Sequence, residues 1–138
     1  MDAAVPRSCV ETLRWRDGRL EMIDQRVLPV EVVYRDYASA AWVAEGIRSM
    51  VVRGAPAIGC AAAYGVALEA LRFAGAPRAQ FDSALEDAFA VLARSRPTAV
   101  NLFWALKRMR SVSGSMSSAP GPDIAQRLLA EAHEILAE

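Results

Sequence analysis

Two short segments of this chain combine arginine and proline in a way that suits the binding of an anion. In the first, Arg53-Gly54-Ala55-Pro56, the proline predicts that a helix begins at Pro56, with Ala55 as its N-cap. Ala55 has no side-chain oxygen to accept a hydrogen bond from the N–H groups of the first turn. Those N–H groups, the guanidinium of Arg53 and the open backbone at Gly54 together predict a phosphate site.

The second segment, residues 96–101 (Arg-Pro-Thr-Ala-Val-Asn), repeats this design. Here Pro97 is expected to be the first helical residue, with Arg96 at the helix mouth and Asn101 one turn further on. If the two helix starts converge, their arginines can hold one dianion between them. The alternative is that both arginines, with Asn101, are solvated residues at the ends of surface helices.

Composition limits the classes of function. The 138 residues are 54% hydrophobic and 23% charged, which is typical of a soluble globular domain, and the 16 basic and 16 acidic residues balance. This balance disfavours partners such as nucleic acid or an anionic membrane. Cys9 and Cys60 form neither a disulfide framework nor a zinc ligand set, so a cytoplasmic protein without a metal is expected. Residues 1–10 lack the apolar core of a secretion signal, and the longest uncharged run, residues 54–68, is too short to span a bilayer.

The pattern of apolar residues predicts an α+β fold: a small N-terminal antiparallel β meander followed by a helical bundle. Alternation on either side of Asp17-Gly18 predicts a hairpin of residues 13–16 and 19–22, and a third extended segment is expected over residues 30–34. One face of this meander is apolar and should cover the helices, because a meander alone is marginally stable. That face consists of Leu13, Trp15, Leu20 and Met22.

Helical periodicity takes over after residue 38. Ser39 is expected to cap the first helix and Asp123 the last, while His133, the one histidine, is expected at a solvated helix position and Cys60 as a buried, inert thiol. The expected helices run over residues 39–50, 56–73 and 79–94, from Pro97 to about residue 110, and from residue 123 onward, with a polar linker over residues 111–122.

Three motifs resemble a known family. Leu13-Arg14-Trp15, residues 52–59 (Val-Arg-Gly-Ala-Pro-Ala-Ile-Gly) and residues 96–102 (Arg-Pro-Thr-Ala-Val-Asn-Leu) are similar to the N-terminal domain of the methylthioribose-1-phosphate isomerases, over residues 12–138. The same superfamily holds ribose-1,5-bisphosphate isomerases and the regulatory subunits of the eukaryotic exchange factor for translation initiation. Those regulatory subunits do no isomerase chemistry, so fold alone does not separate the functions.

The resemblance implies an intramolecular oxidoreductase of methionine salvage. Such an enzyme is a cytoplasmic homodimer that converts 5-methylthioribose 1-phosphate to 5-methylthioribulose 1-phosphate without metal or organic cofactor. The resemblance places Arg53, Gly54, Ala55 and Arg96 in substrate binding, chiefly at the phosphate. In the family a cysteine and an aspartate of a C-terminal Rossmann-like domain do the chemistry, and the 138 residues do not include that domain. The chain alone is therefore expected to be inactive, with no catalytic residue of its own.

The expected organisation is a disordered or extended N-terminus over residues 1–11, the meander over 12–36, and a helical substrate-phosphate-binding domain over 37–138 that is cut short at its C-terminal end. Two alternatives remain for the function. One is a non-catalytic binding or assembly module of the same superfamily, and the other is an isomerase for a different sugar 1-phosphate, such as ribose 1,5-bisphosphate. Binding of a sugar phosphate at Arg53 and Arg96 separates the module from the enzymes.

Overall fold

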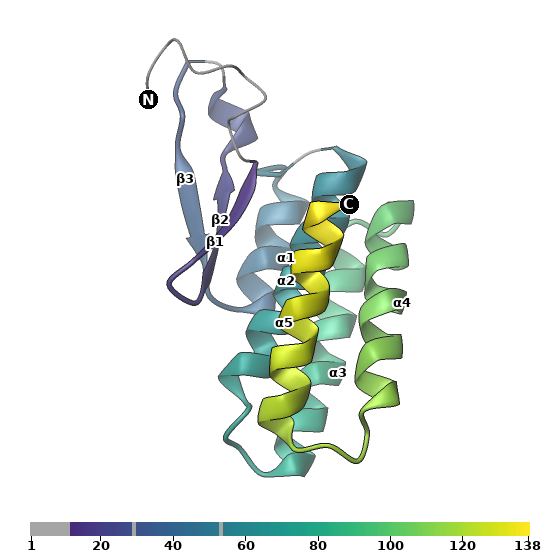
Figure 1. Cartoon of the computed structure of the whole chain (residues 1–138). Helices are drawn as coiled ribbons and strands as arrows, with labels where there is room; N and C mark the ends of the chain where they lie inside the picture. Colours follow the sequence, from purple (N-terminus) through teal and green to yellow (C-terminus); the bar gives the residue numbers. More distant parts are fainter. Residues whose placement is uncertain (1–11, 29, 53) are drawn as a thin grey trace.

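In the computed structural model of the chain, the described residues form a three-stranded sheet that stands beside a bundle of five helices (Figure 1). The structure describes residues 12–28, 30–52 and 54–138, so the expected disorder of residues 1–11 falls outside it. The strands are β1 (Leu13–Arg16), β2 (Arg19–Ile23) and β3 (Tyr34–Tyr37), paired antiparallel in the order β1-β2-β3, and the short 3-10 helix η2 (Gln25–Val27) follows β2. The α+β class and the meander are therefore confirmed.

The predicted hairpin is confirmed with its register. Leu13 pairs with Met22 and Trp15 with Leu20. Asp17 and Gly18 both have positive φ, 53° and 75°, which is the conformation of the two-residue turn that matches the twist of the strands. The paired residues share one face, and all of them except the half-buried Trp15 are buried.

The third strand lies later in the chain than predicted. The prediction of an extended segment over residues 30–34 is wrong. The strand that pairs with β2 is β3, in which Tyr37 pairs with Leu20. Asp24 caps η2 and turns the chain before the expected segment begins. Val30 is 89% exposed, so the apolar alternation at this point does not face the core.

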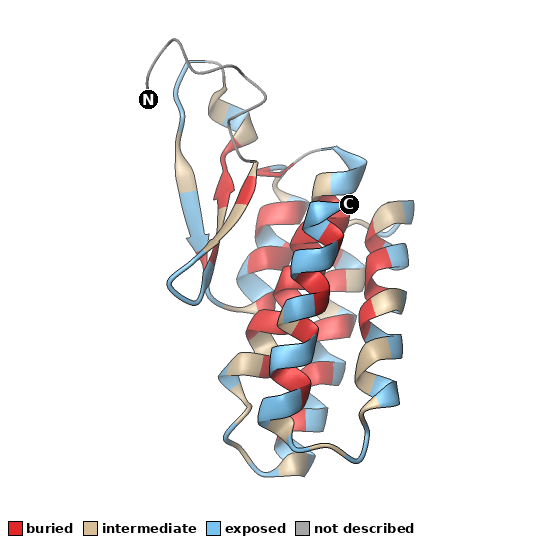
Figure 2. Ribbon diagram, in the orientation of Figure 1, coloured by how far each residue is buried: buried red, intermediate tan, exposed pale blue. Residues whose placement is uncertain are grey.

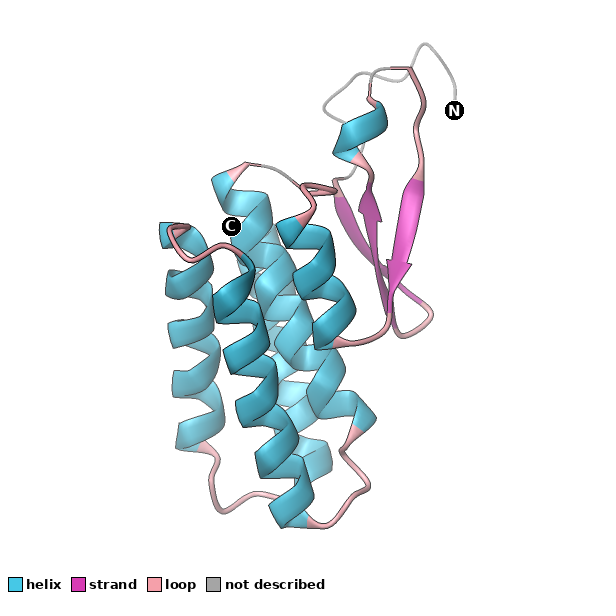
Figure 3. Ribbon diagram, turned by 180° about the vertical axis from the view of Figure 1, so that it is seen from behind, coloured by secondary structure: helices cyan, strands magenta, loops and turns pink. Residues whose placement is uncertain are grey.

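Five helices form the bundle, and successive helices run in opposite directions (Figures 1 and 3). Because the directions alternate, the second and fourth helices start at the end of the bundle where the first, third and fifth helices end. The first helix is capped as predicted, since the Ser39 side chain accepts a hydrogen bond from the N–H of Trp42. The helices are α1 (Ala40–Arg48), α2 (Ala55–Arg72), α3 (Arg78–Ser95), α4 (Val100–Ser115) and α5 (Gly121–Ala137).

Helix α2 is the centre of the bundle, and 12 of its 18 residues are buried (Figure 2). It contacts every other helix and the first two strands. Small residues make this possible: a Cβ added at Gly65 would lie 3.1 Å from Leu92 of α3 and 3.4 Å from Val43 of α1. Although α2 is apolar, none of the helices within the described residues is long and hydrophobic enough to cross a membrane.

Two predicted boundaries near the C-terminal end are wrong. Residues 111–115, expected in a linker, continue α4. Within them, the hydroxyl groups of Ser113 and Ser115 donate to backbone carbonyls three residues earlier. Helix α5 begins at Gly121, so Asp123 lies in its first turn and does not cap it. An acidic side chain is favourable there because it faces the positive end of the helix dipole.

Aromatic rings join the sheet to the bundle. Trp15 of β1 stacks on Tyr64 of α2, with 5.5 Å between the ring centroids. His133 of α5 is exposed, as predicted, but its Nδ1 lies 2.6 Å from the hydroxyl oxygen of Tyr64. Burial raises the pKa of Tyr64 to about 12, so the phenol keeps its proton at neutral pH and can donate it to the imidazole in a hydrogen bond.

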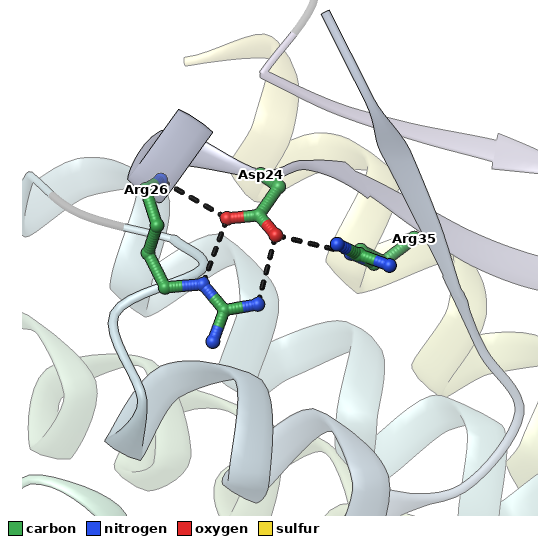
Figure 4. Close-up of polar contacts among 3 residues, drawn as sticks. All are labelled: Asp24, Arg26 and Arg35. Carbon is green, nitrogen blue, oxygen red and sulfur yellow. Dashed lines mark hydrogen bonds and ion pairs between the residues drawn. The ribbon is translucent and has the colours of Figure 1, made fainter. Parts of the chain in front are cut away.

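A buried carboxylate holds the turn between β2 and β3 (Figure 4). Asp24 is fully buried and accepts hydrogen bonds from the backbone N–H, Nε and Nη2 of Arg26 and from Nε of Arg35, at 2.8 to 3.0 Å. We call these three residues the Asp24 cluster. The hydrogen bonds from the Arg26 side chain are the main reason that the pKa of Asp24 lies far below its usual range.

This lowered pKa predicts an acid-dependent loss of stability. The unfolded chain binds a proton at Asp24 near pH 3.8, whereas the folded chain does so only at much lower pH. The contribution of Asp24 to the free energy of unfolding is therefore complete above about pH 5. Below that pH it decreases, by at most about 1.4 kcal/mol per pH unit. We expect urea unfolding between pH 2 and pH 6 to show a shallower pH dependence for Asp24→Asn than for the native chain. Parallel curves would contradict this assignment.

Candidate functional site

The two arginine-proline segments meet at one end of the bundle. A pocket of about 350 Å³ lies there, beside the first turns of α2 and α4, and we call it the helix-start pocket. Gly54, Ala55 and Arg96 all line it, whereas Arg53 lies outside the described residues. The full lining is Met50, Gly54, Ala55, Ile58, Arg96, Ala99, Val100 and Asn101.

Helix α2 begins one residue earlier than predicted. Gly54 is the N-cap, Ala55 is the first helical residue and Pro56 the second. Gly54 has φ 94° and ψ 130°, a conformation that glycine adopts far more readily than other residues, and this backbone geometry places the cap there. No side chain caps this helix start, and a Cβ at Gly54 would meet nothing within 4 Å. The space beside Gly54 at this helix start is therefore open.

Helix α4 begins three residues later than predicted. Pro97 is not its first residue: the N–H of Ala99 donates to the carbonyl of Arg96 at 3.0 Å, which closes a turn with Pro97 at its second position. The fixed φ of proline suits that position as well as it suits a helix start. Ala99 is then the N-cap of α4 and supplies no side-chain acceptor, so this helix start is uncapped too.

Backbone contact between α2 and α4 brings the two helix starts together. A Cβ added at Gly59 would lie 3.0 Å from the backbone oxygen of Asn101 and 3.7 Å from Cβ of Ala105. The two helices also run in the same direction, so the positive ends of both dipoles lie beside the same pocket. With the Arg96 guanidinium and no acidic side chain in its lining, the pocket favours an anion.

The end of α1 borders the pocket through Met50. Carbonyl groups in the last turn of α1 accept hydrogen bonds from the residues that follow the helix, so they do not face the pocket unpaired. The N–H of Val51 donates to Gly46 and the N–H of Met50 to Ile47, the pairing by which many helices end. Met50 occupies the left-handed position of this motif, with φ 69°, where glycine is the usual residue. Sequence analysis missed Met50, because nothing in its neighbourhood signals that a methionine would take a position normally filled by glycine.

A larger cavity of about 490 Å³ adjoins the helix-start pocket and shares Asn101 with it. Cys60 lines this cavity but is almost completely buried, and burial chiefly raises the pKa of its thiol. Cys60 therefore stays protonated at neutral pH, in agreement with the inert thiol expected there. In the described part of the chain, no three His, Cys, Asp or Glu side chains are grouped to hold a metal ion.

The contact at Gly59 predicts the effect of adding one methyl group. Gly59→Ala should destabilise the chain by about 1–3 kcal/mol, because the methyl group would press on the backbone oxygen of Asn101. Gly114→Ala, also in a helix but facing open space, is the matched control and should stabilise the chain by about 0.5 kcal/mol. Urea unfolding measures both, and a neutral Gly59→Ala would show that α2 and α4 are further apart.

The chain is similar to known proteins over nearly its whole length. Residues 51–138 match the family described as the initiation factor 2 subunit family. The methylthioribose-1-phosphate isomerase of Albidiferax ferrireducens is 64% identical over 131 residues, which are 95% of this chain and 37% of that protein. The isomerase of the same name from Methylococcus capsulatus is 56% identical over 93% of this chain and 35% of its own length.

Two solved structures share the fold. The 5-methylthioribose 1-phosphate isomerase from Pyrococcus horikoshii matches with a TM-score of 0.87 and 36% identity, over 98% of this chain and 39% of that one. The delta subunit of translation initiation factor eIF-2B from A. fulgidus matches with a TM-score of 0.83 and 32% identity, over 91% and 36%. The chain spans less than two fifths of the length of each of these relatives.

Proposed function

Because the chain belongs to the initiation factor 2 subunit family, we propose that it is the phosphate-binding part of an aldose-ketose isomerase acting on 5-methylthioribose 1-phosphate in methionine salvage. The relatives described above include methylthioribose-1-phosphate isomerases, which supports an isomerase function for the full-length protein. The observation that carries the proposal is the helix-start pocket, where two uncapped helix starts and Arg96 surround one cavity.

In this proposal the phosphate binds chiefly to backbone. N–H groups of the first turns of α2 and α4 donate to its oxygens, and the absence of a side chain at Gly54 lets the phosphate approach the chain closely. Arg96 adds a charge-assisted contact from the turn before α4, and the sequence assigns Arg53 the same part before α2. Each such contact is worth about 1.5–3 kcal/mol where water is excluded.

The reaction needs more than this pocket contains. In a sugar 1-phosphate the anomeric carbon carries the phosphate, so simple ring opening is blocked, and moving hydrogen between adjacent carbons requires positioned acid and base groups. The described residues that line the helix-start pocket include no carboxylate, imidazole or thiol. We therefore propose that this chain holds the substrate, and that the acid and base come from a C-terminal Rossmann-like domain. The proposed enzyme is a cytoplasmic homodimer that uses no metal or organic cofactor.

A second candidate function is a non-catalytic assembly module, which the likeness to the delta subunit of translation initiation factor eIF-2B supports. Apolar side chains on the outside of α4 favour it as well, because Val100 is 78% exposed and the neighbouring Phe103 and Trp104 are also exposed. Such a patch is typical of a surface that contacts protein. A module of this kind has no need to bind phosphate, whereas the proposed isomerase must bind it. Phosphate binding therefore separates the two candidates.

Phosphate binding tests the proposal directly. We expect Arg96→Ala and Arg53→Ala each to weaken the binding of inorganic phosphate about 10- to 100-fold, because each removes one charge-assisted contact. Arg94→Ala is the matched control, since Arg94 is exposed at the end of α3 and does not line the pocket, and it should bind like the native chain. Isothermal titration measures the three variants. Equal affinities would refute the proposed site, and a native chain that binds no phosphate would favour the assembly module.

A further inference from the structure

We propose that Asp24 is a positioning residue for the helix-start pocket: through the Asp24 cluster it holds Val51, which lies shortly before the start of α2. The inference rests on the proposed function, because it assigns the cluster a part in phosphate binding at that pocket. None of the three residues of the cluster lines the pocket, so the effect must be transmitted through the backbone.

The Asp24 carboxylate joins two elements that are separate in the chain. Its oxygens accept hydrogen bonds from Arg26 of η2 and from Arg35 of β3, and the side chain is fully buried (Figure 4). The backbone N–H of Asp24 also donates to the carbonyl of Val33 at 2.6 Å. A buried carboxylate is tolerated only when such donors surround it, so this turn has one well-defined geometry.

The residue after Asp24 carries that geometry to the loop. The backbone N–H of Gln25 donates to the carbonyl of Val51 at 2.8 Å, and the N–H of Val51 donates to Gly46 at 2.9 Å. Val51 is therefore held on one side by the Asp24 turn and on the other by the end of α1. Val51 and Val52 are both buried, which leaves this part of the loop little freedom.

Gly54 follows Val51 by three residues and is both the N-cap of α2 and part of the pocket lining. In this proposal, a shift at Val51 changes where the first N–H groups of α2 point. Pockets built from backbone N–H groups depend on such pre-organisation, because those groups cannot adjust independently as side chains do. In this proposal the turn between β2 and β3 influences the geometry of a pocket that none of the described strand residues lines.

The chain offers a matched control for this inference. Glu131 of α5 is also a buried carboxylate, 6% exposed, and it is paired with Arg108 and Arg127. None of these three residues lines the helix-start pocket or contacts the loop before α2 in a hydrogen bond. Glu131→Gln therefore removes the same kind of interaction as Asp24→Asn at a place unconnected with that loop.

We expect Asp24→Asn to weaken the binding of inorganic phosphate by about tenfold relative to the native chain, whereas Glu131→Gln should change it by less than about twofold. Arg35→Lys is a milder variant for the case in which Asp24→Asn does not fold: the Arg35 side chain is 49% exposed, and lysine keeps the charge but loses the Nε contact. It should weaken phosphate binding about threefold. Isothermal titration on chains shown to be folded by circular dichroism measures these affinities.

A second readout keeps the two proposals distinguishable. Hydrogen exchange at the Val51 amide should become about tenfold faster in Asp24→Asn, or about threefold faster in Arg35→Lys, and stay unchanged in Glu131→Gln. Unchanged exchange and affinity in the cluster variants, or equal losses in Glu131→Gln, would overturn the positioning role. If the native chain bound no phosphate, the proposed function would fail, and accelerated exchange confined to the cluster variants would still establish that Asp24 holds the loop.

Discussion

Burial of α2 on all sides is the constraint on which the rest of this structure depends. A helix at the centre of a bundle must let its neighbours approach closely, and α2 does so with glycine and alanine along most of its length. Tyr64 is the large exception, and its hydroxyl group is satisfied by His133. The other helices and the sheet are arranged around α2, and each contributes one apolar face to it.

The position of the candidate site follows from this arrangement. The direct approach of α4 to α2 at Gly59 places two uncapped helix starts side by side, and the tight ending of α1 satisfies carbonyl groups that would otherwise repel an anion. The pocket thus lies between two helix starts, and Arg96 is the charged side chain among the described residues that line it. Such a site demands accurate placement of the segment before α2, and the buried Asp24 turn is connected to that segment by the hydrogen bond from Gln25 to Val51.

Local signals made much of this fold predictable. Asp17-Gly18 predicts the hairpin turn because both residues adopt positive φ readily, and Ser39 predicts a helix start because its side chain can cap the helix. The start of α4 could not be predicted, because proline suits a turn and a helix start equally well. The Asp24 cluster was also beyond local analysis, since Arg35 reaches the carboxylate from eleven residues away only after the meander has formed. The site residues Gly54, Ala55 and Arg96 were predictable as candidates, but their meeting depends on helix packing.

The stacking of Trp15 on Tyr64 makes the junction between sheet and bundle optically distinct. Trp42 and Trp104 are 64% and 48% exposed, so their emission is that of indole near water, whereas Trp15 is half-buried against a phenol ring with an imidazole at its edge. Aromatic rings stacked on one another give near-ultraviolet circular dichroism, and exposed rings without an aromatic neighbour give less. The chain therefore carries an intrinsic chromophore whose signal follows the docking of the meander on the helices, separately from the far-ultraviolet signal of the helices themselves.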